Sequence, residues 1–239
     1  MARPFRRYSA GARWYDVLSG ERWVYRAGRV AGIGLMGLQA GDVVLDLGCG
    51  TGLNFPLLRA AVGDSGRIVG VDRSADMLAV ARERVAREGW TNVTLIEADA
   101  SELDVEAVRE RIGVEAGSGG LDPRRVDGAG DDGTSVDALL ATYALSVMRG
   151  GATEAWRRAV ALVRPGGVLA VVDMQPPTGR WRVFSPLARL ACALGGADIH
   201  ARPWRLVARD AAPGSVSETA VRGGHIVAAV GRLRPSASL

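Results

Sequence analysis

The chain has 239 residues, of which 48% are hydrophobic and 23% are charged, a balance that suits one globular domain with an appended segment or two. Its two cysteines and two histidines are too few for a disulfide scaffold or a zinc cluster, so we expect no metal site and a reducing, cytoplasmic setting. The 30 basic residues, all arginine, exceed the 26 acidic ones by four and form no long basic run, which argues against a nucleic-acid partner.

The first 40 residues, Met1–Ala40, carry aromatic side chains such as Trp14 and Tyr15 among arginines. We expect an amphipathic, helical cap over the site end of the sheet, distinct from a main domain at 41–239. Arg6 and Arg7 form a twin-arginine pair, but charged residues interrupt every apolar stretch that could serve as an export signal. Later apolar runs are too short for a membrane span. We therefore expect no integral membrane segment, and transient membrane contact stays open.

From residue 41 onward, short Val/Ile/Leu-rich runs alternate with segments of helical period, which is typical of βαβ units and a parallel sheet covered on both faces. The last two runs are separated only by Arg222-Gly-Gly and predict a closing antiparallel hairpin. The predicted class is a three-layer α/β/α fold with a doubly wound, seven-stranded sheet. The predicted strands are Val43–Leu47, Arg67–Asp72, Asn92–Glu97, Val136–Thr142, Gly167–Asp173, Val216–Val221 and His225–Gly231.

A helix is predicted between the second and third strands. Ser74 is a suitable N-cap, and Met77, Ala81 and Val85 recur every four residues to give one apolar face. Gly89 is the expected stop. The helix should pack on the sheet by that apolar face.

Two boundaries are predicted in the second half of the chain. A helical segment, Ala152–Val163, should end at Arg164-Pro-Gly-Gly, because Pro165 cannot continue a helix. Residues Gly113–Ser135 contain seven glycines and four aspartates in 23 positions and have little apolar content, so they predict a flexible surface insert.

The strongest functional signal is the turn after the first strand, where Gly48, Gly50 and Gly52 alternate before a predicted helix, Leu53–Ala61. Glycines at a turn of this kind let a ligand approach the backbone closely. A dinucleotide fingerprint would place its third glycine at the position of Leu53, and a phosphate-binding loop would need a lysine. The spacing therefore favours a nucleoside without phosphates.

Carboxylates stand at the ends of three successive strands. Asp72 follows the glycine turn by about twenty residues, where it can accept hydrogen bonds from a ribose diol. Asp99 comes within reach of an adenine amino group, and Asp46 can orient the glycine loop or meet an ammonium group. Because the carboxyl ends of parallel strands share one edge, the three should lie together.

Five motifs occur in order along the chain: Val44-Leu-Asp-Leu-Gly-Cys-Gly-Thr-Gly52, Gly70-Val-Asp-Arg-Ser74, Glu97-Ala-Asp-Ala100, Val136-Asp-Ala-Leu-Leu-Ala-Thr-Tyr143 and Leu162-Val-Arg-Pro-Gly-Gly-Val-Leu-Ala-Val-Val-Asp173. With them the chain resembles the class I S-adenosylmethionine-dependent methyltransferases over about residues 41–232. The resemblance implies a Rossmann-like, seven-stranded sheet with a reversed last strand, and S-adenosylmethionine as the cofactor.

The resemblance also implies roles for single residues. Gly48–Gly50 would lie along the methionine part of the cofactor, Asp72 would bind the ribose, and Asp99 with Ala100 would meet the adenine, which Met77 would cover on one face. The implied cofactor-binding residues are Tyr15, Asp46, Gly48, Cys49, Gly50, Asn54, Asp72, Arg73, Met77, Asp99, Ala100 and Thr142.

Three further pieces resemble bacterial methyltransferases that act on amines of lipid headgroups: Gly52-Leu-Asn-Phe-Pro-Leu-Leu58, Thr142-Tyr-Ala-Leu-Ser146 and Arg202-Pro-Trp-Arg205. The class I resemblance itself implies that Thr142 lines the sulfonium side and that Tyr15 closes over the cofactor. The segment 142–146 lacks the Phe-Gly-x-Arg-Asn stretch of quinone C-methyltransferases and the Asn/Asp-Pro-Pro-aromatic tetrapeptide of enzymes that methylate nucleic-acid bases. The expected acceptor is a small molecule or a lipid headgroup.

The implied reaction is in-line transfer of a methyl group to a nitrogen or oxygen, in a site that excludes water. An amine must arrive neutral, whereas a hydroxyl needs a base, for which the candidates are His200, Tyr143 and Asp173. A merely solvent-exposed or core-satisfied histidine is the competing interpretation of His200. The candidate substrate-binding residues are Arg202, Trp204 and Arg205.

Two alternatives stay open. An enzyme of this kind can transfer the aminocarboxypropyl group of the same cofactor instead of the methyl group, and the mass of the product distinguishes the two. A noncatalytic cofactor-binding protein would bind without turnover. The sequence predicts no oligomeric state.

Overall fold

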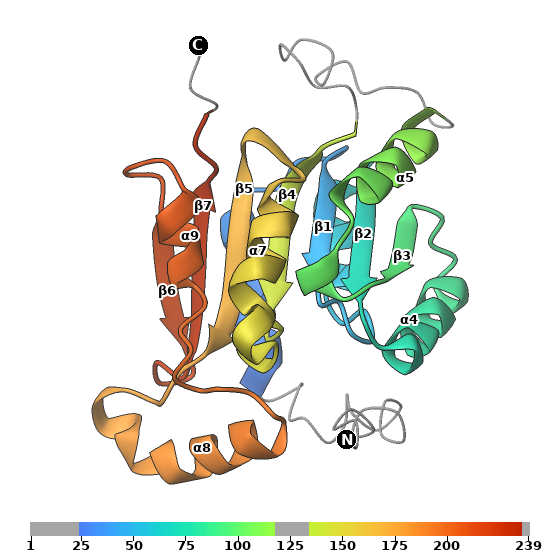
Figure 1. Cartoon of the computed structure of the whole chain (residues 1–239). Helices are drawn as coiled ribbons and strands as arrows, with labels where there is room; N and C mark the ends of the chain where they lie inside the picture. The colour runs from blue at the N-terminus through green and yellow to red at the C-terminus, as the bar shows by residue number, and fades with distance from the viewer. Residues whose placement is uncertain (1–23, 118–133, 236–239) are drawn as a thin grey trace.

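The computed structural model of the chain describes residues 24–117 and 134–235. These residues form a seven-stranded sheet in the order β3-β2-β1-β4-β5-β7-β6 (Figure 1). Neighbours among β1 to β5 pair in parallel, whereas β7 is antiparallel to both β5 and β6. The predicted class and the reversed last strand are thereby confirmed. The strands are β1 (Val43–Leu47), β2 (Arg67–Asp72), β3 (Val93–Glu97), β4 (Val136–Thr142), β5 (Val163–Met174), β6 (Ser217–Val221) and β7 (Ile226–Arg232).

Helices cover both faces of the sheet and give three layers (Figure 1). One face packs against α2 (Arg26–Met36), α3 (Phe55–Val62) and α4 (Ala75–Arg87). The other face packs against α5 (Val105–Gly117), α7 (Ala152–Val160) and α9 (Arg205–Asp210). The remaining elements are α8 (Ser185–Leu194) and the short 3-10 helices η2 (Ala100–Glu102), η3 (Leu145–Val147), η4 (Arg149–Gly151) and η5 (Gly179–Phe184).

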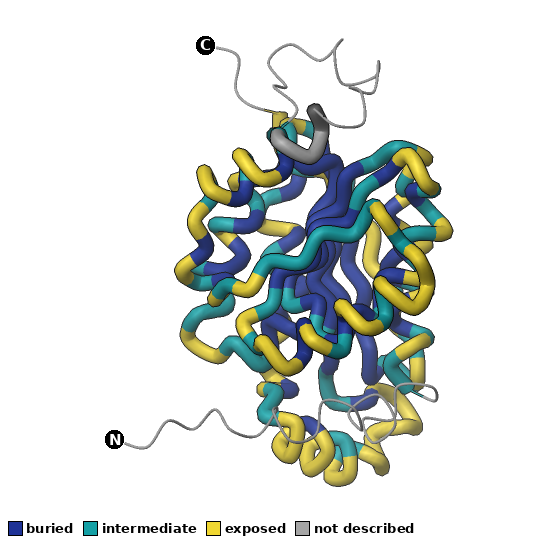
Figure 2. Tube along the Cα trace, turned by 90° about the vertical axis from the view of Figure 1, so that its right-hand side faces the viewer, coloured by how far each residue is buried: buried dark blue, intermediate teal, exposed yellow. Residues whose placement is uncertain are grey.

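Burial on both faces explains why the strands read as continuous apolar runs. Along β1, Leu45 and Leu47 point into the core beneath α5 and α7, while Val44 points into the core beneath α2 and α3. Figure 2 shows the buried strands at the centre and the exposed outer sides of the helices around them. The sheet is therefore a rigid base for the loops at its edges.

Helix α4 begins and ends where the sequence predicts. Oγ of Ser74 accepts a hydrogen bond from the backbone N–H of Met77 at 3.3 Å, which is an N-cap. Met77 and Ala81 are buried on the inner face, and Gly89, at φ +67°, terminates the last turn. This helix fixes the end of β2 and the loop that follows it.

Two predicted boundaries are wrong. Helix α7 ends at Val160 and β5 already begins at Val163, so the Pro-Gly-Gly stretch lies inside the strand instead of between elements. The register with β4 shifts there, because Val136 pairs with Val163 but Ala138 pairs with Val168. Gly166, at φ +73°, makes this bulge possible, and in a bulge Pro165 need not supply a ladder hydrogen bond.

The predicted insert also starts later than residue 113. Helix α5 continues to Gly117, because Val108 and Ile112 are buried against the sheet and carry the helix past that point. The rest of the predicted insert, residues 118–133, lies outside the described residues, as do residues 1–23 of the predicted cap. Among the described helices, none combines the length and the apolar character that a membrane span requires.

Helix α2 lies unusually close to the sheet. A Cβ on Gly28 would overlap Tyr143 Oη and Ile226, and a Cβ on Gly32 would overlap Val172. The two glycines stand four residues apart, on one face of the helix, and let its backbone approach β5 and β7. This approach brings Arg29, the residue next to Gly28, to the edge of the sheet.

Candidate active site

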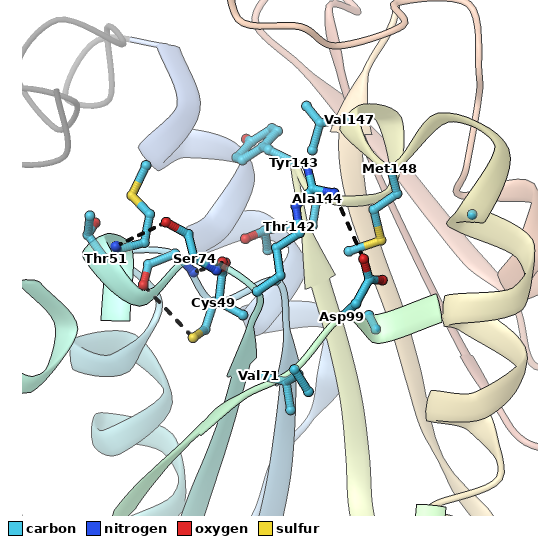
Figure 3. A pocket seen from close by; sticks show the side chains of 18 of the residues that line it. Cys49, Thr51, Val71, Ser74, Asp99, Thr142, Tyr143, Ala144, Val147 and Met148 are labelled. Carbon is cyan, nitrogen blue, oxygen red and sulfur yellow. Dashed lines mark hydrogen bonds and ion pairs between the residues drawn. The ribbon is translucent and has the colours of Figure 1, made fainter. Parts of the chain in front are cut away.

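A cavity of about 290 Å³ opens at the carboxyl ends of β1, β2 and β4 (Figure 3). Strand β1 leads to α3 on one face and its neighbour β4 leads to α7 on the other, so the chain diverges between them and leaves a crevice. Around it lie Arg29, Gly48, Cys49, Gly50, Thr51, Leu53, Val71, Asp72, Arg73, Ser74, Met77, Ala98, Asp99, Ala100, Ser101, Thr142, Tyr143, Ala144, Val147, Met148 and Gly151.

The glycine turn after β1 forms the floor of the cavity. Gly48, Gly50 and Gly52 have φ angles of +71°, +55° and +77°, a region that favours glycine. A Cβ on Gly48 would overlap Ala144, so this position also needs glycine for space. The backbone N–H groups of Gly48 and Cys49 both donate to the carbonyl of Val71, at 2.8 and 3.0 Å, and tie the turn to β2.

Asp72 at the end of β2 is held by two backbone donors. The N–H of Gly50 donates to Oδ2 and the N–H of Ser74 donates to Oδ1, each at 2.9 Å. Burial raises the pKa of this carboxyl, and the two N–H donors oppose that effect. Each oxygen can accept a further hydrogen bond, so the carboxylate is oriented for a pair of donors from the cavity.

Asp99 lies beyond β3 on the same edge. Its Oδ1 accepts hydrogen bonds from the N–H and Oγ of Ser101, at 2.9 and 2.7 Å, and these bonds lower the pKa of Asp99. Its Oδ2 stands 4.0 Å from NH1 of Arg73, with both side chains partly exposed. Asp99 is therefore an ionised acceptor at the open end of the cavity.

A buried polar network lies behind the cavity wall and joins α2, β1, β4 and the start of α3. NH1 of Arg29 donates to Asn54 Oδ1 at 2.9 Å and to Thr142 Oγ1 at 2.7 Å. Nδ2 of Asn54 donates to Asp46 Oδ1 at 2.8 Å, whereas Asp46 Oδ2 accepts nothing from the described residues. Burial raises the pKa of Asp46 to about 7, although the hydrogen bond from Asn54 and the positive charge of Arg29 both act to lower it. The network thus leaves one oxygen of a buried carboxylate without a donor among the described residues.

The cavity gathers most of the residues that the sequence predicts for the cofactor. Nine of the twelve line it directly, and Asp46 and Asn54 lie in the network behind it. Tyr15 lies outside the described residues. In Figure 3 Cys49, Thr51 and Ser74 stand on one side of the cavity, and Val147 and Met148 on the other.

Sequence reasoning missed Arg29. It is 9% exposed and lines the cavity, although the region before residue 41 has no motif. In a chain whose cations are all arginine, one more arginine carries no signal. The spacing of Gly28 and Gly32 on one helical face was the signal available, since it marks a helix that lies close to its neighbours.

Two candidate bases are held by the fold. The hydroxyl of Tyr143 donates to the backbone carbonyl of Tyr25 at 2.8 Å, and its ring lines the cavity 5.0 Å from Cζ of Arg29. Asp173 is buried beside the cavity without lining it, and accepts hydrogen bonds from the N–H groups of Ser146 and Met174 at 3.2 and 2.8 Å. Burial raises the pKa of Asp173 to about 6. Its contacts anchor the loop after β4.

Four candidates are not brought to the cavity. His200 is exposed, and its backbone N–H donates to Asp198 at 2.8 Å. Arg202 and Arg205 are also exposed, while Trp204 is buried in the core beneath α9. Trp204 therefore contributes to the packing of the core.

Residues 44–111 match a family model described as a methyltransferase domain. A demethylmenaquinone methyltransferase of Shouchella clausii is 46% identical over 68 residues, which are 28% of this chain and 29% of that protein. The match therefore spans less than a third of the length of that relative.

Solved methyltransferases share the fold over most of the chain. A SAM-dependent methyltransferase from Aquifex aeolicus has a TM-score of 0.54 at 16% identity, covering 94% of this chain and 98% of that one. A phosphoethanolamine N-methyltransferase from Haemonchus contortus has a TM-score of 0.63 at 15% identity, covering 95% of this chain and 58% of that one. Residues 44–111 thus match a methyltransferase domain in sequence, and the sheet order together with these structures shows the fold of the class I S-adenosylmethionine-dependent methyltransferases.

Proposed function

We propose that the chain binds S-adenosylmethionine in this cavity and directs transfer of its methyl group to the nitrogen or oxygen of a small molecule or lipid headgroup. The observation that carries the proposal is the oriented Asp72 carboxylate beside the glycine turn, because that pair suits a ribose diol on a phosphate-free nucleoside. The bound cofactor supplies an electrophilic methyl group on a sulfonium sulfur. The protein then has to position both reactants and exclude water.

The nucleoside end of the proposed site is formed by β2, β3 and α4. Asp72 accepts the ribose hydroxyls, and Asp99, held by Ser101, accepts from the adenine amino group. Met77 and Ala100 line this part of the cavity and supply apolar surface for the base. Arg73 stays near Asp99 at the rim.

The amino-acid end is formed by the buried network. Arg29, which lines the cavity beside this network, pairs with the carboxylate of the methionine part. Asp46 supplies the opposite charge for the ammonium group, and Asn54 and Thr142 hold the two charges apart at fixed positions. The buried Asp46 oxygen without a donor supports this assignment.

The acceptor end is assigned to the loop after β4. Tyr143, Ala144, Val147 and Met148 give this wall a largely apolar character. The described lining residues include no histidine, and the Tyr143 hydroxyl is engaged as a donor. An acceptor that is nucleophilic without prior loss of a proton, such as a neutral amine, suits this wall better than a hydroxyl that needs a base. The relatives named above are said to methylate a demethylmenaquinone or phosphoethanolamine, so both acceptor types belong in the screen.

The proposal includes a cytoplasmic location and a helical cap at residues 1–40 on a methyltransferase domain at 41–239. Both cysteines of the chain are free and buried, as is common in a reducing compartment. Fractionation of cells that express the full chain tests the location.

Isothermal titration with S-adenosylmethionine, S-adenosylhomocysteine and NAD tests the cofactor. We expect saturable binding of the first two and none of NAD, with affinity about 100-fold weaker in Asp72→Ala, because two charge-assisted hydrogen bonds are lost. Asp64→Ala is the matched control, since this carboxylate is exposed near the start of β2, at the opposite end of that strand. Binding of NAD alone would overturn the proposal.

The acceptor is identified by mass. Wild-type protein with labelled cofactor is incubated with amines, lipid headgroups, hydroxyl compounds and a demethylated quinone, and each product is weighed. A gain of one methyl group supports the proposed reaction. A gain of the aminocarboxypropyl group, or binding without any product, contradicts it.

A further inference from the structure

Elements η5 and α8 carry an apolar surface that nothing in the described chain covers. Helix α8, the lowest helix in Figure 1, is mostly exposed in Figure 2. Six large apolar side chains along these elements are between 45% and 73% exposed, which is unusual for neighbours in one patch. We call them the α8 surface: Trp181, Val183, Phe184, Leu187, Leu190 and Leu194.

The inner side of α8 fixes which face is exposed. Cys192 is buried, and its Sγ lies 3.7 Å from Sδ of Met174 at the end of β5. Ala188, one turn earlier, packs into the same cluster. Leu187, Leu190 and Leu194 are spaced by three and four residues and lie on the opposite side of the helix. The helix is therefore anchored, and its apolar face is held outward.

Positive charge surrounds the apolar face. Arg180, Arg182 and Arg189 are all exposed, and residues 175–197 contain no acidic residue. In the part of the chain that the structure describes, none of the three makes an ion pair, and Arg180 lies 5.3 Å from the ring centroid of Trp181. Aromatic and leucine side chains beside arginines are the composition of a helix that lies in a membrane interface.

We propose that the α8 surface docks on an anionic phospholipid bilayer, with its apolar side chains among the acyl chains and its arginines at the headgroups. Ten residues of α-helix are too short to cross the bilayer, so the helix lies along it. A second copy of the chain is a poorer partner. A twofold interface would bring two copies of this arginine-bearing surface together, and residues 175–197 supply no acidic residue to pair with the arginines.

The docked orientation turns the cavity toward the bilayer. Strand β5 ends at Met174, beneath α8, on the same edge of the sheet where β1, β2 and β4 end at the cavity. Tyr143 packs in the cluster below α8 and also lines the cavity. If the proposed function holds, an acceptor embedded in the membrane can reach the site without leaving the membrane. The docking proposal itself does not rest on that function.

Co-sedimentation of the full chain with vesicles tests the docking without any cofactor. We expect binding to vesicles of phosphatidylglycerol and phosphatidylcholine, much weaker binding to phosphatidylcholine alone, and weakening as the salt concentration rises. Leu187→Ser with Leu190→Ser should lower the partition coefficient by about tenfold or more. Replacing Arg180, Arg182 and Arg189 by glutamine should lower it by about 100-fold on the anionic vesicles alone.

Matched controls change the same chemistry elsewhere. The first control, Leu35→Ser with Val216→Ser, removes two exposed apolar side chains. The second control removes three exposed charges on α4 and α5 by replacing Arg82, Arg87 and Arg111 with glutamine. Both should bind vesicles like the wild type. Thermal unfolding confirms that every variant is folded.

Three results would overturn the docking proposal: no binding to anionic vesicles by the folded wild type, equal losses in the control variants, or sedimentation velocity that shows a dimer lost in the leucine variant. Titration with S-adenosylmethionine is independent of all of them. A chain that binds vesicles but no cofactor refutes the proposed function and keeps the docking.

Discussion

The two sides of the cavity are built by different means. On the side of β1 and β2, backbone donors from the loops that follow these two neighbouring strands hold the polar side chains. Gly50 and Ser74 donate to Asp72, and the glycine turn itself is tied to Val71. This side is held by contacts between two neighbouring strands and the loops that follow them.

The side of β4 and β5 depends on contacts between distant elements. Tyr143 is a non-glycine residue with a strained backbone conformation, at φ +55°. Its hydroxyl donates a hydrogen bond to the backbone carbonyl of Tyr25, 118 residues earlier in the chain. The N–H of Ser146 is held by Asp173 from the next strand. Local backbone geometry thus sets the first side, and the packing of whole elements sets the second. Substitutions on the two sides should therefore differ in what they damage.

The largest expected effect is on the first side, at Gly48. Gly48→Ala adds a Cβ at positive φ and against Ala144, so we expect a loss of about 3 kcal/mol in the free energy of unfolding. Gly150→Ala is the control from the second side, since its Cβ would meet open space and its φ is not in the left-handed region. Urea unfolding measures both. Equal stability of the two variants would remove the distinction between the sides.

The second effect concerns Asp173, whose folded-state pKa of about 6 lies above its ordinary value of 3.8. A raised pKa means that the folded state holds the proton more tightly, so this stabilisation is full below about pH 4 and is lost as the pH rises to about 6. In the wild type the free energy of unfolding should fall by about 2–3 kcal/mol over this pH range because of Asp173, and Asp173→Asn should abolish that fall. Urea unfolding at pH 4, 5, 6 and 7 measures the slope. Asp64→Asn should keep the slope of the wild type, and an unchanged slope in Asp173→Asn would refute the assignment.

The third effect tests Arg29, which links the two sides through Asn54 and Thr142. If the proposed function holds, Arg29→Gln should weaken S-adenosylmethionine binding about 30-fold, since one buried charge-assisted contact is worth about 2 kcal/mol. Arg26→Gln, an exposed residue of the same helix, should leave the affinity within a factor of two. Titration calorimetry decides, and equal affinities of both variants would exclude Arg29 from the cofactor site.

The smallest effect sharpens the role of packing between elements. Gly28→Ala should cost about 1.5 kcal/mol, because its Cβ would force α2 away from Tyr143 and Ile226. Gly34→Ala in the same helix meets open space and should gain about 0.5–1 kcal/mol from helix propensity. Thermal unfolding compares the two. A stabilised Gly28→Ala would show that the close approach of α2 is unnecessary.

The same contrast explains how far the sequence could lead. All seven strands were predicted within a few residues, because each is a buried run bounded by turn residues. The bulge at Pro165 was missed because proline and glycine punctuate loops and bulges alike. The first side of the cavity was predictable because its glycines and carboxylates stand directly after predicted strands that end at one edge of the sheet.

The second side could not be predicted in this way. Trp204 resembles a binding residue in a list of motifs, yet it is buried beneath α9, because an aromatic side chain in a short motif packs as readily as it binds. His200 is exposed and does not line the cavity. Arg29 reaches the site only through the tertiary contact of α2 with the sheet, and no local pattern encodes such a contact.

The two buried thiols give the chain a pair of built-in reporters. Cys49 lies in the glycine turn and Cys192 on the inner face of α8, and burial raises the pKa of both, that of Cys192 to about 11. A thiol reagent reacts with an accessible thiolate, so labelling of Cys192 requires local opening of α8, whereas labelling of Cys49, which lines the cavity, reports access to the cavity floor. Labelling rates followed by mass spectrometry therefore separate the breathing of the cavity floor from the lifting of α8, without any change to the sequence.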